Sequence, residues 1–354
     1  MTTEPTIWRD YGGHHTRYQE PGHTISTLEQ LTTVVREAAA HGQRLRLRGN
    51  GHSMNGLANP RPGECLLLMQ QCNHYRFDQP GTITVGAGAA VWDVHHYLQS
   101  RGHGLYVYND GGAAASSLGG YLAAGGFGQS SAANGGFWES VESITLVDGQ
   151  GEVHQLQRDH PHFRWLFGSM GQLGVAFELQ LRIDSPQQAS YPLGSSGRIE
   201  ASRHDWEPTL WYTLFVPEDD WQTAYRALRA IGSEHRHAWR GRWPYAYAIP
   251  FKQFNPPLIT AHQGNLAAVG IWGDRPDNGF DWQAVQQIEH DLHALIADQP
   301  LWRRYLQTEY CSPQFDYAAY FGSAVFSQWQ QLKQHYDPEQ RLNTGVFCPA
   351  GEHA

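Results

Sequence analysis

The first regular pattern in the chain is a stripe of apolar residues at helical spacing. It predicts a helix over residues 26–41. Ser26 and Glu29 form a capping-box pattern at its start, and Gly42 is a typical residue for its end. The apolar face of this helix consists of Leu28, Leu31, Val34, Val35 and Ala38.

Arginine and leucine then alternate over residues 44–48, as is typical of a half-buried strand. A glycine-containing loop, residues 49–53, follows this strand directly. The pattern of apolar and polar residues predicts further strands at residues 65–69, 82–86 and 141–147, and a second helix at residues 91–101. The first half of the chain is therefore predicted to mix helices and strands.

A stretch rich in glycine, alanine and serine occupies residues 111–136. One interpretation is a low-complexity linker. We favour an ordered segment, because apolar residues interrupt the stretch and the strand predicted at residues 141–147 follows it. These apolar residues are Leu118, Tyr121, Leu122 and Phe127.

Beyond about residue 186 glycine becomes rarer, tryptophan becomes more frequent, and strand–helix pairs are predicted. The pairs are a strand at 210–216 with a helix at 220–231, and a strand at 266–272 with a helix at 281–297. Both helices begin with Asp-Trp-Gln, at Asp220 and Asp281, and aspartate is a favourable N-cap. The repeat indicates either a duplicated β-α half, as in ferredoxin-like sheets, or a coincidence of three residues.

Composition narrows the class of protein. The 38 glycines are about 11% of the 354 residues, against an average of about 7%, and loops that wrap a ligand need such backbone freedom. A net charge of -9 argues against a nucleic-acid partner, whose phosphates require a basic face. No apolar stretch is long enough for a membrane span, and the first residues lack the pattern of a secretion signal.

The cysteines also bear on the cellular compartment. The four of them are scattered along the chain without a CxxC pattern, and they are expected to be free, mostly buried thiols. Free thiols are typical of a reducing compartment, so we expect a cytoplasmic protein.

The loop after the first predicted strand carries the clearest chemistry. In Arg48-Gly49-Asn50-Gly51-His52-Ser53, successive backbone N–H groups can form a cradle for an anion. Glycine lets a pyrophosphate approach the backbone closely, and Ser53 adds a hydroxyl donor. No lysine follows as in a Walker A loop, and no GxGxxG opens a helix, so ATP and NAD in their usual cradles are disfavoured.

The segment RGNGHSMNG, residues 48–56, resembles the pyrophosphate loop of the vanillyl-alcohol oxidase/p-cresol methylhydroxylase (PCMH-type) class of FAD enzymes, in particular cytokinin dehydrogenases and other histidyl-FAD oxidases. Segments similar to those of this family follow in the same order, at residues 85–92, 118–126, 168–175 and 337–345. The resemblance covers roughly residues 26–183 and 329–348.

This resemblance implies a covalent bond between His52 and the methyl carbon on flavin C8. The alternative is that His52 only hydrogen-bonds the loop or the flavin edge. A second bond to cysteine is not expected, because residues 113–117 contain none. The implied cofactor-binding residues are Arg48, Gly49, Asn50, Gly51, His52, Ser53, Asn55, Gly112, Ser116, Ser117, Gly119, Gly120, Gly125, Val175 and Asn343.

The base that accepts the substrate proton is a separate question. Cytokinin dehydrogenases place an aspartate shortly before the glycine-rich segment, and Asp110 lies near that place without exact register. Its alternative role is that of an Asp-Gly turn residue. Tyr310, together with its neighbours Glu309 and Tyr317, is a candidate by position on the stretch that returns from the middle of the chain.

The fold expected from the resemblance is α+β, with a PCMH-type FAD-binding domain of two subdomains formed by residues 1–185 and 329–354. Residues 186–328 are expected to form an inserted α+β cap domain on an antiparallel sheet, which binds the substrate. The tryptophans of this region suggest an aromatic or largely apolar small molecule. Histidine pairs such as His95-His96 and His290/His293 lack a third ligand, so no metal site is predicted.

The predicted function is that of an FAD-dependent oxidase or dehydrogenase. It would transfer hydride from a C–H beside an alcohol or amine to flavin N5, with oxygen or another acceptor reoxidising the flavin. One alternative is oxidative cyclisation or desaturation in a biosynthetic pathway. Another is a non-catalytic flavin protein that serves as an electron-transfer subunit.

Overall fold

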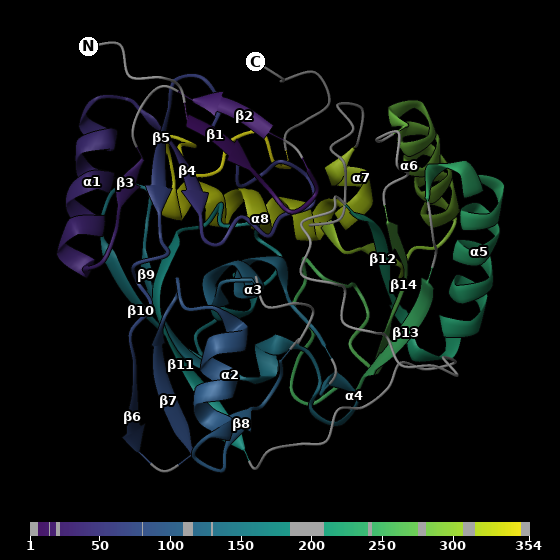
Figure 1. Ribbon diagram of the computed structural model, residues 1–354, viewed down its shortest axis with the longest axis horizontal. Coiled ribbons are helices and arrows are strands. Elements are labelled where there is room, and N and C mark those ends of the chain that lie inside the picture. Colours follow the sequence, from purple (N-terminus) through teal and green to yellow (C-terminus); the bar gives the residue numbers. More distant parts are fainter. Residues whose placement is uncertain are drawn as a thin grey trace.

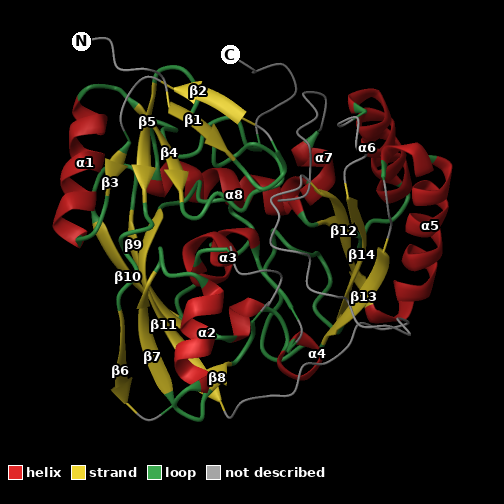
Figure 2. Ribbon diagram, viewed as in Figure 1, coloured by secondary structure: helices red, strands yellow, loops and turns green. Residues whose placement is uncertain are grey.

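The computed structural model describes residues 6–13, 15–18, 22–79, 81–108, 116–128, 130–184, 209–239, 243–274, 281–306 and 316–347. Within these ranges the chain forms a short N-terminal hairpin and three sheets, with helices packed between and outside them (Figures 1 and 2). No helix in the described part of the chain combines the length and apolar character needed to cross a membrane.

The N-terminal elements surround the start of the glycine loop. They are the hairpin strands β1 (Thr6–Arg9) and β2 (His15–Tyr18), and the parallel strands β3 (His23–Thr24), β5 (Glu64–Leu68) and β4 (Arg44–Arg48), which pair in that order. Helix α1 (Leu28–Ala40) packs its apolar face on this parallel sheet. The predicted strand at residues 44–48 is confirmed by β4.

The predicted cap of α1 is wrong by one residue. Thr27, not Ser26, is the N-cap, and its hydroxyl accepts the backbone N–H of Gln30 at 3.2 Å. The Gln30 side chain accepts the N–H groups of both Ser26 and Thr27 in return. Either pair fits the capping-box spacing, and glutamine rather than Glu29 occupies the required third position.

A larger antiparallel sheet lies beneath the parallel one. Its strands are β6 (Tyr75–Gln79), β7 (Thr82–Gly86), β9 (Val141–Val147), β10 (Val153–Gln157) and β11 (Val175–Asp184), in the order β10-β9-β11-β7-β6, and β8 (Gly104–Leu105) pairs with β11. Helices α2 (Val91–Gln99), α3 (Leu118–Ala124) and α4 (Ser131–Asn134) follow in this region. The strands predicted at 82–86 and 141–147 match β7 and β9 exactly.

The third sheet has the order β13-β14-β12-β15, and every pair in it is antiparallel. Its elements follow the chain as β12 (Thr209–Pro217), α5 (Trp221–Glu234), β13 (Trp243–Ile249), β14 (Leu266–Asp274), α6 (Trp282–Ala297) and β15 (Arg303–Arg304). Both helices cover the outer face of the sheet (Figure 1). This βαββαβ order is that of a ferredoxin-like unit, which agrees with the predicted pair of β-α halves.

The two Asp-Trp-Gln triplets have different roles. Asp281 is the N-cap of α6, and its carboxylate accepts the N–H groups of Gln283 and Ala284. Asp220 makes no such cap, because its carboxylate accepts the indole N–H of Trp302 at 2.9 Å. Asp220 therefore occupies the expected N-cap position of α5 without capping it through its side chain, and α5 continues past the predicted end to Glu234.

Alternate side chains of β12 pack into two different hydrophobic cores. Leu214 and Val216 point to the core under α5 and α6, whereas Phe215 points to the core shared with the large sheet and α3. Alternate side chains of a strand face opposite sides of the sheet, so one strand serves both cores. The ferredoxin-like unit is thereby packed on the first half of the chain through buried aromatic side chains, such as the edge contact between Phe127 and Phe215.

The end of the chain returns to the first sheet. After α7 (Tyr317–Phe321) and α8 (Ser323–Tyr336), Leu342 forms a parallel bridge with Leu45 beside β4. The buried carboxylate of Asp337 accepts the N–H groups of Arg341 and Leu342 and a hydrogen bond from the Lys333 ammonium. The prediction that this tail is ordered and docks on the fold is confirmed.

A buried ion pair joins β4 to β5 just before the glycine loop. The Arg46 guanidinium donates from Nε to the Glu64 carboxylate at 2.8 Å, and neither side chain is more than 2% exposed. Arg46 also donates to the carbonyls of Leu57 and Thr344, at 3.2 and 2.9 Å. The pairing with Arg46 lowers the pKa of Glu64 despite its burial, so the carboxylate stays charged at neutral pH.

Arg46→Met should lower the free energy of unfolding by about 3–5 kcal/mol, because it leaves the Glu64 carboxylate buried without a cation. Urea unfolding measures this loss. The double variant R46M/E64M removes both charges and should recover much of it. As a control, Arg36→Met breaks an exposed pair with Glu152 and should cost less than about 1 kcal/mol. Equal losses for R46M and R36M would contradict the importance of the buried pair.

Candidate cofactor site

A cavity of about 1070 Å³, counted with its open mouth, lies where β4 ends. Its wall comes from segments far apart in the sequence: the glycine loop, α3, the segment before β11, and the C-terminal tail. The predicted cofactor-binding residues on this wall are Gly49, Asn50, Gly51, His52, Ser53, Asn55, Ser116, Ser117, Gly119, Gly120, Val175 and Asn343. The structure thus brings most of the predicted set together around one space.

The glycines of the loop are required by the close approach of other groups. A Cβ on Gly49 would lie 2.0 Å from the Ser117 hydroxyl oxygen. Gly51 has a φ of +69°, which side chains disfavour, and a Cβ there would lie 2.3 Å from a guanidinium nitrogen of Arg48. The loop therefore presents bare backbone to the cavity, as a bound pyrophosphate requires.

Two predicted residues support the wall without lining the cavity. Arg48 is buried and donates to the carbonyls of Arg9 and Ala58, at 2.5 and 3.1 Å, so it holds the loop from behind. Gly125 ends α3 in the left-handed conformation, and a Cβ there would lie 2.3 Å from the Ile259 side chain. Both residues support the wall, and neither lines the cavity among the described residues, so their assignment as direct cofactor ligands stays a prediction.

His52 is half-buried in the cavity wall. The Ser116 hydroxyl lies 3.4 Å from its Nδ1, and the Tyr11 ring stacks on the imidazole with 4.3 Å between ring centroids. Burial lowers the pKa of His52 to about 4, because the enclosed site disfavours a charged imidazolium. The imidazole is therefore neutral at physiological pH and can act as a nucleophile or a hydrogen-bond acceptor.

Asn343 links the tail to two other parts of the wall. Its Oδ1 accepts the N–H of Leu47 at 2.9 Å, and its Nδ2 donates to the Met170 carbonyl at 2.8 Å. Asn343 is buried with a φ of +46°, which asparagine tolerates better than most residues. It supports the predicted role of the tail by holding the end of β4 against the segment before β11.

Other wall residues were missed by sequence reasoning. They are mainly Tyr121, Ser169, Met170, Gly171 and Tyr305. The segment containing Met170 carried a family-like motif, from which only Val175 was selected. Tyr121 lies in the family-like segment at residues 118–126, although it was not selected. No sequence signal distinguished Tyr305 from core tyrosines, because its place on the wall depends on how the third sheet packs against α3.

The two wall tyrosines are neutral hydrogen-bonding groups. Burial raises the pKa of both the Tyr121 and the Tyr305 phenol, so both keep their protons. The Tyr121 hydroxyl is buried and has no hydrogen-bond partner among the described residues. The residues that line the cavity in the described ranges include no aspartate, glutamate, lysine or arginine. The wall thus offers neutral donors and backbone dipoles in place of charges.

Three predicted residues lie outside the described residues. They are the candidate bases Asp110 and Tyr310 and the candidate cofactor ligand Gly112, and with them the neighbouring candidate Glu309. Their roles stay predictions.

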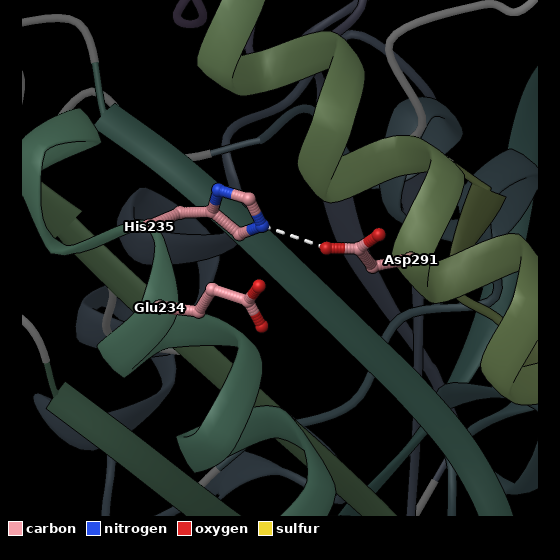
Figure 3. Close-up of side chains that lie close together, drawn as sticks. All are labelled: Glu234, His235 and Asp291. Carbon is pink, nitrogen blue, oxygen red and sulfur yellow. Dashed lines mark hydrogen bonds and ion pairs between the residues drawn. The ribbon is translucent and has the colours of Figure 1, made fainter.

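One group of possible metal ligands occurs elsewhere in the described part of the chain. Glu234, His235 and Asp291 each bring a ligand atom within 4.8 Å of the others, at the end of α5 and on α6. His235 Nε2 lies 2.6 Å from the Asp291 carboxylate (Figure 3). Gln287 donates to the other oxygen of Asp291 at 3.0 Å. These polar atoms already connect the two helices, and sequence spacing did not reveal the grouping.

Residues 24–157 match the model of the FAD binding domain. D-arabinono-1,4-lactone oxidase of Eremothecium gossypii is 29% identical over 163 residues, which are 44% of this chain and 30% of that protein. The enzyme of the same name from Candida albicans is 24% identical over 173 residues, with the same coverage of both chains. An uncharacterized oxidoreductase of the fasciation locus of Rhodococcoides fascians is 28% identical over 165 residues, which are 46% of this chain and 37% of that protein.

The match thus spans about a third of the length of these curated relatives. The matched domain contains β4, the glycine loop and α3, which form most of one side of the cavity. The domain and the names of the relatives support an FAD-linked oxidoreductase.

Gly49→Ala should weaken FAD binding at least tenfold, because the added methyl group meets Ser117 and narrows the cradle. Fluorescence titration of FAD into apoprotein measures the dissociation constant. Val153→Ala is the control, since Val153 is an exposed residue of β10 outside the cavity wall. FAD binding of G49A within twofold of the V153A value would contradict the assignment of the loop.

Proposed function

We propose that this FAD-linked oxidoreductase holds FAD by a covalent bond to His52 and oxidises a C–H beside an alcohol or amine of a small organic molecule. The observation that carries the proposal is a neutral imidazole on the wall of a glycine-lined cavity within the matched FAD-binding domain. Bound FAD supplies a two-electron acceptor for such an oxidation.

The residues present fit this cofactor. The bare backbone at Gly49 and Gly51 would hold the pyrophosphate through N–H donors. Ser116 and Ser117 offer further hydroxyls beside His52. Because the described wall has no lysine or arginine, these neutral donors would have to hold the two negative charges of FAD.

Covalent attachment is favoured by the state of His52. Only an imidazole without the extra proton has a lone pair free for bond formation, and burial keeps His52 in that form above about pH 4. Stacking on Tyr11 and contact with Ser116 would also hold the ring in one orientation. The resemblance of residues 48–56 to histidyl-FAD oxidases points to the same attachment.

We place the substrate between the flavin loop and the ferredoxin-like unit, for which residues 186–328 were predicted as a cap. Ligands commonly bind where two packed units meet. Tyr305, which follows β15 of that unit, lines the cavity together with Tyr121 of α3. A buried Tyr121 hydroxyl without a described partner is suited to donate to a substrate oxygen.

A second candidate substrate class is a polar, hydroxyl-bearing lactone. It is favoured by the names of the two D-arabinono-1,4-lactone oxidases and by the phenol of Tyr121. The aromatic residues of the ferredoxin-like unit favour an aromatic or largely apolar alcohol instead. Each class contains a C–H beside a hydroxyl, so the type of oxidation is the same for both.

His52→Ala should release the flavin when the protein is denatured, whereas the wild type should retain yellow colour and fluorescence in a denaturing gel. The reason is that the imidazole is the proposed nucleophile. His103→Ala is a control, since His103 lies outside the described cavity wall and its ring lies beside that of Phe77. Flavin that stays bonded to H52A would show that another residue carries the attachment.

Tyr121→Phe should slow reduction of the flavin by substrate at least tenfold, with little loss of thermal stability. Removing a buried hydroxyl without a partner leaves the fold intact but takes a hydrogen-bond donor from the proposed substrate site. Stopped-flow absorbance near 450 nm without oxygen, with aldonolactones and aromatic alcohols, measures reduction. If none of these reduces the wild-type flavin, the proposed substrate classes are wrong.

A further inference from the structure

The N-terminal hairpin lies against the glycine loop although it precedes the matched domain, which begins at residue 24. Its described turn, residues 10–13, contacts the loop through backbone, side chain and ring at once. The sequence predicted neither the strands of this segment nor its contacts with the loop. One of these contacts is between the ring of Tyr11 and the imidazole of His52.

Two backbone hydrogen bonds fix the loop to the hairpin. The Tyr11 N–H donates to the Gly51 carbonyl at 2.9 Å, and the Gly12 N–H donates to the Ser53 carbonyl at 3.1 Å. In a trans peptide the carbonyl and the next N–H point in opposite directions. The N–H groups of His52 and Met54 are therefore directed away from the hairpin.

Asp10 contacts the last residue of the loop and the residues that follow it. Its carboxylate is buried and accepts the Gly56 N–H at 2.6 Å and the Ser53 hydroxyl at 3.4 Å. Gly12 lets the hairpin turn lie directly against the backbone of Met54, since a Cβ at Gly12 would lie 2.3 Å from the Met54 carbonyl oxygen. The hairpin thus contacts the loop at successive points from Gly51 to Gly56.

Tyr11 controls the orientation of the imidazole. Its ring and the His52 ring are 4.3 Å apart and 21° from parallel, a stacked arrangement that covers one face of the imidazole. Rotation of His52 about its side-chain bonds would break this stacking. The nucleophile is therefore held in one plane before any cofactor bond forms.

We propose that the hairpin strands β1 and β2 and the described turn at residues 10–13 are a clamp on the flavin loop, and that Tyr11 is a positioning residue that orients His52 for attachment to FAD. This inference rests on the proposed His52 bond. Overall, the imidazole N–H and one C–H of the flavin 8-methyl group are replaced by an N–C bond. Molecular oxygen takes up the two hydrogens and two electrons and leaves as hydrogen peroxide.

The test compares Tyr11→Ala and Tyr11→Phe with the wild type. Protein produced under riboflavin limitation is mixed with FAD in air, and the covalent fraction is followed by fluorescence in denaturing gels. Attachment should be about tenfold slower in Y11A, which loses the stacking, and within twofold of wild type in Y11F, which keeps it. Tyr75→Ala is the matched control, because Tyr75 is an exposed tyrosine on edge strand β6.

A second readout does not depend on the bond. Hydrogen exchange of the backbone amides of residues 49–56 should be faster in Y11A than in wild type and Y11F, because the clamp is loosened. Total FAD bound, measured after proteolysis, separates weak binding from slow attachment. Tyr75→Ala should change neither the exchange of these amides nor the rate of attachment.

The outcomes separate the two proposals. If wild-type flavin is released on denaturation, the covalent bond of the proposed function fails, and hydrogen exchange alone then decides whether the clamp exists. If Y11A attaches FAD at the wild-type rate and its loop amides exchange as in wild type, the clamp is overturned while the His52 bond stands. Equally slow attachment in Y11F and Y11A would also overturn the clamp, since the stacked ring, which Y11F keeps, would then not be what orients His52.

Discussion

The buried Arg46–Glu64 pair is the interaction on which the rest of the site depends. A guanidinium enclosed in protein must keep all its acceptors, because a charge left without them is costly. Its acceptors come from β5, the segment after the loop, and the C-terminal tail. These parts of the chain, nearly three hundred residues apart in sequence, are therefore fixed together directly before the glycine loop.

The shape of the glycine loop, residues 49–53, depends on this arrangement. Asn343 holds the end of β4 from the tail, Arg48 donates to the hairpin backbone, and Ser117, the N-cap of α3, packs against Gly49. These contacts hold the loop at its start from three separate parts of the chain. A preorganised loop loses less conformational entropy when a ligand binds, which favours tight binding of a pyrophosphate without any lysine.

The sequence predicted the features that depend on residues close together in the chain. The strands at residues 82–86 and 141–147 and the glycine loop follow from alternation and turn chemistry in the sequence, whereas the role predicted for His52 came from the resemblance. The cap of α1 and the role of Asp220 were mispredicted, because two neighbouring residues both suited the cap and a distant Trp302 competed for the aspartate. The positions of Tyr11 and Tyr305 could not be predicted, since each depends on packing between segments far apart in the chain. Asp110 and Tyr310 stay predictions.

The absence of charged side chains from the described cavity wall connects the chemistry of the site to its proposed attachment. A pyrophosphate held only by amides and hydroxyls gains less than one paired with arginine or lysine, because charge-assisted hydrogen bonds are about twice as strong as neutral ones. Burial in this wall also lowers the pKa of His52 and keeps its imidazole neutral. The buried, uncharged wall therefore offers FAD no ion pair, and the same burial keeps His52 in the neutral form that could bond to FAD covalently.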